Sequence, residues 1–65
     1  MKIVVNGEKV EVTETVLDAV LVELGHGDAK VATAVNEEFV PATLRAATSL
    51  EAGDRLEIVA PRQGG

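Results

Sequence analysis

Cysteine, tryptophan and tyrosine are absent from this 65-residue chain, and phenylalanine and histidine each occur once. Without cysteine the protein can form neither a disulfide nor a thiolate metal site, and one histidine cannot build a zinc centre. We therefore expect no bound metal and no bound cofactor. No apolar run approaches the roughly 18 residues that span a bilayer. Because the chain also opens on a strand-like run rather than a leader-like segment, we expect a cytoplasmic protein without a membrane role.

Positive charge is also scarce, with 6 basic against 11 acidic side chains and a formal net charge of −5. This balance repels a phosphate backbone, so nucleic-acid binding is not expected, whereas a basic surface on a protein partner would be attracted. No catalytic constellation is present: His26 and Ser49 have no triad spacing, and Glu37 and Glu38 are typical of a solvated turn. No glycine pattern of a phosphate-binding loop occurs either. We predict that the protein is not an enzyme.

What the chain does contain is valine, leucine, isoleucine and alanine in regular patterns. Residues 2–6 and 9–13 are strand-like runs around Asn6-Gly7, the pair that favours a tight hairpin turn because both of its positions need positive φ. Residues 31–35 and 39–40 indicate a second pair of strands, which Pro41 ends because it has no amide proton. Residues 55–60 alternate as a last strand, with Leu56 and Ile58 facing inward.

The stretch TETVLDAVLVELGHGD, residues 13–28, predicts the main helix. Thr15 is expected to cap it, with Asp18 completing a capping box, and Gly25 is a natural left-handed stop. Apolar side chains recur at helical spacing along one side. A further helical turn is expected near residues 43–46.

Together these elements predict an α+β fold, the β-grasp: a mixed sheet of four or five strands with one main helix on one face. The strand after the helix is expected beside the first strand, and the last strand enters between elements already in place. Residues 1–60 form the single domain and residues 61–65 a flexible tail. The expected core consists of Ile3, Val5, Val10, Val12, Leu17, Val20, Leu21, Leu24, Val35, Val40, Leu50, Leu56 and Ile58.

A β-grasp of this length ending in Gly-Gly resembles the ubiquitin-like sulfur carriers of bacteria, and most of all the thiamine sulfur carrier family. The resemblance covers the whole chain and depends on the segments IVVNGE, AVNEEFVP, LEAGDRLEIV and the terminal QGG. Two positions depart from it. That family usually has Arg after the VP pair and Trp three residues later, where this chain has Ala42 and Arg45.

The resemblance implies a function for the tail. An ATP-dependent adenylating enzyme of the ubiquitin-activating type would activate the carboxylate of Gly65, so ATP is used by the partner. A sulfur donor such as a cysteine desulfurase would then supply sulfur to form a thiocarboxylate, which thiazole synthase would consume. Gly64 and Gly65 lack a Cβ and can enter a narrow channel, and Pro61 separates the tail from the sheet.

The remaining site residues are expected to contact the partner enzymes. Arg62, Gln63 and Gly64 would be recognised as the tail enters, although Arg62 has the alternative of only keeping the tail soluble. Val4, Phe39 and Val59 are the predicted docking residues: Val4 and Val59 are expected to point outward from the sheet face turned away from the helix, with Phe39 near the edge of that face. The alternative is that scattered exposed valines need no explanation.

Other functions share these features. The small subunit of molybdopterin synthase is also a β-grasp with a Gly-Gly end, but is usually longer. A ubiquitin-like modifier would use the same activation step and end in an isopeptide bond. A plain interaction domain with a fortuitous or engineered tail is the third alternative.

Overall fold

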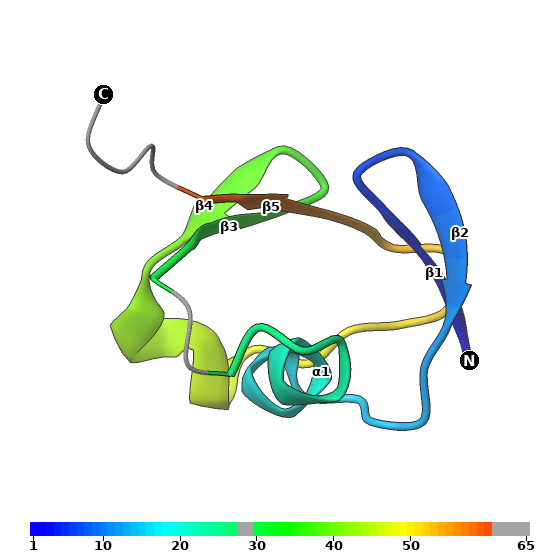
Figure 1. The fold of residues 1–65 in the computed structure, drawn as a ribbon, viewed down its shortest axis with the longest axis horizontal. Helices are drawn as coiled ribbons and strands as arrows, with labels where there is room; N and C mark the ends of the chain where they lie inside the picture. Colours follow the sequence, from blue (N-terminus) through cyan, green and yellow to red (C-terminus); the bar gives the residue numbers. More distant parts are fainter. Residues whose placement is uncertain (28–29, 61–65) are drawn as a thin grey trace.

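The computed structural model describes residues 1–27 and 30–60, which form a five-stranded sheet with a helix against one face (Figure 1). In chain order the elements are β1 (Lys2–Val5), β2 (Glu8–Glu11), α1 (Leu17–Glu23), β3 (Ala32–Val35), β4 (Glu38–Val40), the 3₁₀ helix η1 (Ala42–Ala47) and β5 (Arg55–Val59). Each strand found lies within or next to a segment whose alternation predicted it. Among the described residues, none of the helices combines the length and apolar character needed to cross a bilayer.

The strand order in the sheet is β2-β1-β5-β3-β4. β1 and β5 run parallel, and the other neighbouring pairs are antiparallel. The last strand therefore enters the middle of the sheet, as expected of a β-grasp. The prediction that β3 lies beside β1 is wrong, because β5 occupies that position and pairs with both.

Both hairpins turn through two residues with positive φ. Asn6 and Gly7 have φ values of 50° and 87°, and Asn36 and Glu37 have 50° and 71°. The first pair is the predicted Asn-Gly turn. In the second pair Glu37 adopts a left-handed conformation that is unfavourable for a residue with a Cβ.

The helix begins later than the sequence pattern suggests. Val16 is its N-cap residue and no side chain caps it, so the prediction that Thr15 caps the helix is wrong. Val16 forms an antiparallel bridge with Ser49, and the Thr15 carbonyl accepts a hydrogen bond of 2.7 Å from the Leu50 amide. These contacts hold residues 15 and 16 extended. At the other end Gly25 has φ 89°, which confirms it as the left-handed stop.

The core lies between α1 and the facing side of the sheet. Every residue predicted to belong to it is either buried or packed against buried neighbours. Thr33 is also buried, at 1% exposure, although it was not predicted. The buried apolar residues are Ile3, Val12, Leu17, Val20, Leu21, Val40, Leu50, Leu56 and Ile58.

Candidate functional site

The sheet face turned away from α1 carries an exposed apolar patch. Val59 is 62% exposed and Phe39 is 69% exposed, whereas the large apolar residues on the opposite face of the same strands, such as Ile58 and Val40, are buried. Val59 pairs with Ala32, and Ala34 pairs with Phe39, so two small alanines separate the two large side chains. We call Ala32, Ala34, Phe39 and Val59 the apolar patch.

The third predicted docking residue, Val4, lies on the same face but outside this patch. Val4 is half-buried and pairs with Lys9 on β2 and with Arg55 on β5. Arg55 begins β5 and Val59 ends it, so nearly the whole strand separates Val4 from the patch. The structure thus brings Phe39 and Val59 to one region and places Val4 in another.

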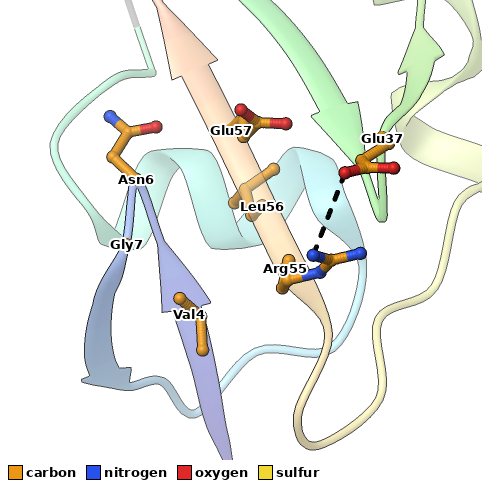
Figure 2. Close-up of a pocket in the computed structure, with 7 residues that line it drawn as sticks. All are labelled: Val4, Asn6, Gly7, Glu37, Arg55, Leu56 and Glu57. Atoms are coloured by element: carbon orange, nitrogen blue, oxygen red, sulfur yellow. Dashed lines mark ion pairs between the residues drawn. The ribbon is translucent and has the colours of Figure 1, made fainter.

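Val4 lines a hollow of about 180 Å³ beside the first three residues of β5, where the two hairpin turns come toward each other (Figures 1 and 2). Arg55 and Glu37 form an exposed ion pair across it at 4.0 Å. The hollow is open and most of its polar side chains are exposed, which is unlike an enclosed ligand pocket. Its lining residues are Val4, Asn6, Gly7, Glu37, Arg55, Leu56 and Glu57.

Charge is distributed unevenly between the two sides of the sheet. On the face with the patch, bases and acids balance: Lys2, Lys9 and Arg55 against Glu11, Glu37 and Glu57. The acidic excess of the described residues therefore lies elsewhere, in the turns, on α1 and at the sheet edges. A partner that meets this face would find a surface without net charge that carries the apolar patch at one side.

Two carboxylates, one on the patch face and one on α1, have lowered pKa values. The N-terminal ammonium group lies 2.8 Å from Glu11 and holds the pKa of that carboxyl below its usual value. Backbone hydrogen bonds from Glu14 and Thr13 lower the pKa of Glu23, which also accepts a bond from the Thr13 hydroxyl. Each carboxylate links two chain segments: Glu11 binds the N-terminus, and Glu23 binds residues 13 and 14, which precede the helix. Within residues 1–27 and 30–60, no group of three or more acidic or histidine side chains could hold a metal ion.

The end of β5 leads toward the predicted reactive tail. Val59 pairs with Ala32 on one side, and Ile58 is held by the side chain of Asn6 on the other. Ala60 is the last described residue. The predicted tail positions Arg62, Gln63, Gly64 and Gly65 lie outside the described residues.

Arg45 stands where the resemblance would place an aromatic residue, and the structure shows what it does there. Its guanidinium group donates to the Thr33 hydroxyl at 3.1 Å and to the Val31 carbonyl, while that hydroxyl donates to the Val40 carbonyl at 2.8 Å. η1 is thus attached to the second hairpin by hydrogen bonds. The feature of the sequence that could have indicated this contact is Thr33, a polar residue at an inward-facing position of an otherwise apolar strand. Ala42, the other departure, is exposed at the start of η1.

The comparisons with known proteins agree with this geometry. The ThiS family model matches residues 3–65. A crystal structure of the thiamine biosynthesis protein ThiS from Geobacter metallireducens superimposes with a TM-score of 0.82 at 26% identity, covering 100% of both chains. A protein named thiazole synthase from Paramagnetospirillum magneticum is 42% identical over 100% of this chain, which spans only 20% of that relative. These matches confirm the β-grasp and the resemblance to thiamine sulfur carriers, and the chain belongs to the ThiS family.

Proposed function

We propose that this protein carries sulfur for formation of the thiazole ring of thiamine, with the carboxylate of Gly65 as the carrying group. The observation on which this depends is the family match, which extends through the Gly64-Gly65 end of the chain. The similarity of the whole fold to a thiamine biosynthesis protein supports it. ThiS proteins are small carriers, which agrees with the prediction of a protein without enzymatic activity.

The chemistry of the carboxylate explains why a partner enzyme is needed. A carboxylate is a poor electrophile, and joining it to AMP from ATP, with release of pyrophosphate, gives it a good leaving group. Hydrosulfide or an equivalent sulfur nucleophile then displaces AMP and leaves a thiocarboxylate. The partners would be an adenylating enzyme of the ubiquitin-activating type and a sulfur donor such as a cysteine desulfurase, in the cytoplasm.

Thiazole synthase is the proposed acceptor of the sulfur. A protein of that name contains a segment that is 42% identical to this entire chain. A carrier-like sequence within a protein named for thiazole synthesis supports the pairing of carrier and enzyme. It also favours the thiamine pathway over the molybdopterin alternative.

The test of the carrier function is the intact mass of the protein after incubation with the activating enzyme, ATP and a sulfur donor. We expect the mass to rise by the difference between sulfur and oxygen. Deletion of Gly65 shortens the reach by about 3.5 Å, which is enough to prevent adenylation. A C-terminal extension replaces the carboxylate by an amide and also prevents it. Thiocarboxylate on the extended chain, or adducts joining Gly65 to other proteins, would contradict the proposal.

We further propose that the apolar patch docks on these enzymes. Val59→Asp would place a charge at the centre of the contact and weaken binding by about ten-fold or more. Val22→Asp is the matched control, because Val22 is a valine of similar exposure, 64%, on the helix. Equal binding by both folded variants would rule out the patch as the docking surface.

A further inference from the structure

β5 extends beyond the end of its neighbour β1, and one side chain replaces the missing backbone there. β1 ends at Val5, which pairs with Leu56, and the Asn6 amide still donates to the Leu56 carbonyl at 2.9 Å. The next backbone groups of β5 that face β1 belong to Ile58. The Asn6 carboxamide oxygen accepts from the Ile58 amide at 2.8 Å, and its nitrogen donates to the Ile58 carbonyl at 3.1 Å.

The carboxamide of asparagine has one acceptor and one donor group, like a peptide unit, and it extends the pairing of β1 by one step. The left-handed conformation of Asn6 in the hairpin turn, φ 50°, is one that asparagine tolerates better than most residues. Asn6 lies beside the upper half of β5 in Figure 2. The turn residue therefore has a second task, which is to hold β5.

The position of this contact along β5 is what relates it to function. Ile58 is three residues before Pro61, which has no amide proton to continue a ladder. On the other side of β5, Val59 has its last partner in Ala32. Within the described residues, these contacts to Ile58 and Val59 are the final ones that fix the strand.

We propose that Asn6 is a positioning residue for the C-terminal carboxylate. This inference rests on the proposed function. Five residues span at most about 17 Å, so fraying of β5 at Ile58 would move the point from which the terminal residues reach the activating enzyme. Adenylation needs the carboxylate within bonding distance of a phosphate, and misplacement by about 1 Å can already slow a reaction about a hundred-fold. The two hydrogen bonds from Asn6 to Ile58 keep that point fixed.

The chain contains a matched control for this contact. Asn36 has the same φ of 50° in the second hairpin turn, and its carboxamide oxygen accepts from the Arg55 amide at 3.0 Å. Its nitrogen donates to a carboxylate oxygen of Asp54 at 3.2 Å. Asn36 therefore holds the beginning of β5, at the opposite end from the tail.

The experiment compares Asn6→Gly with Asn36→Gly. Glycine adopts positive φ readily, so each turn is kept and only the carboxamide is lost. The first measurement is amide hydrogen exchange at Ile58, and the second is kcat and KM for ATP–pyrophosphate exchange by the activating enzyme with the carrier as varied substrate. We expect Asn6→Gly to speed exchange at Ile58 about ten-fold beyond any global loss of stability, as the loss of two hydrogen bonds predicts.

In the enzymatic assay we expect Asn6→Gly to lower kcat about ten-fold with KM unchanged, since docking is intact and only the end of the tail is displaced. Asn36→Gly should change neither value. Asn6→Asp retains the acceptor for the Ile58 amide but loses the donor to its carbonyl, so its kcat should be intermediate.

Equal kcat for Asn6→Gly and Asn36→Gly, or an effect on KM alone, would overturn the inference. An unchanged rate of amide hydrogen exchange at Ile58 in Asn6→Gly would overturn the inference as well. Failure of the activation step itself would be distinguishable, because the wild-type protein would then give no ATP–pyrophosphate exchange at all, and failure of sulfur transfer alone would appear only in the intact mass. Absence of ATP–pyrophosphate exchange would also refute the proposed effect of Asn6 on kcat. Amide hydrogen exchange at Ile58 would still decide whether Asn6 holds β5.

Discussion

The hydrogen bonds between Thr33 and Arg45 allow a quantitative test of how η1 is attached to the sheet. Thr33→Val keeps the side-chain shape and removes the hydroxyl, which donates to the Val40 carbonyl and accepts from Arg45. Because Thr33 is 1% exposed, water cannot easily replace these partners. One neutral and one charge-assisted bond predict a loss of about 2 kcal/mol in the free energy of unfolding. For a domain of this size that lowers Tm by about 8–16 °C.

A double-mutant cycle with Arg45→Met isolates the shared bond. Methionine retains an apolar stem, so packing changes little, and we expect the two losses to overlap by about 1 kcal/mol. The assay is urea unfolding followed by circular dichroism, since the chain has no tryptophan or tyrosine for fluorescence. The m-values must stay unchanged for the comparison to hold. Additive losses would refute the argument that the hydroxyl and the guanidinium group act together.

Three other changes have clear expected outcomes. Glu37→Gly should stabilise the protein by about 0.5–1 kcal/mol, because glycine removes the strain of the left-handed conformation and the lost ion pair with Arg55 is exposed; a lower Tm would contradict this. Glu23→Gln should make the stability depend less on pH in acid. In the wild type the pKa of Glu23 is lowered by folding, so its carboxylate stabilises the folded protein at pH values above the ordinary pKa of 4.5. This stabilisation is lost as the pH falls through the lowered pKa. Identical pH profiles of Tm would contradict that. Leu21→Ala should cost about 2–5 kcal/mol, and unchanged melting would remove Leu21 from the core.

Most of the fold could be predicted because its signals are local. The Asn6-Gly7 turn and the alternation of residues 55–59 depend on neighbouring residues alone, and both were correct. The start of the helix was wrong because a distant contact, between Val16 and Ser49, outweighed the local capping pattern. The left-handed conformation of Glu37 likewise follows from pairing of the second hairpin, since nothing about glutamate itself favours it.

The candidate site was predictable only in part, for a related reason. Alternation correctly placed Val4 and Val59 on the helix-free face, and Phe39 lies near the edge of that face, on β4, as expected. Alternation could not show that Val4 lies apart from the other two, because the insertion of β5 decides which side chains are neighbours. Nor could it show that Asn6 contacts Ile58, a residue 52 positions away.

The insertion of β5 also agrees with the proposed function, in which the C-terminus is presented to an enzyme. The strand that ends at Val59 is the last in the chain but the middle one in the sheet, so neighbours can hold it from both sides. A strand at the sheet edge would have one such neighbour and would fray more readily at its end. Where β1 is too short to serve as that neighbour, Asn6 takes its place. A β-grasp thus places its last strand in the interior of the sheet, and the proposed reach of the terminal residues is then measured from a strand that is held on both sides.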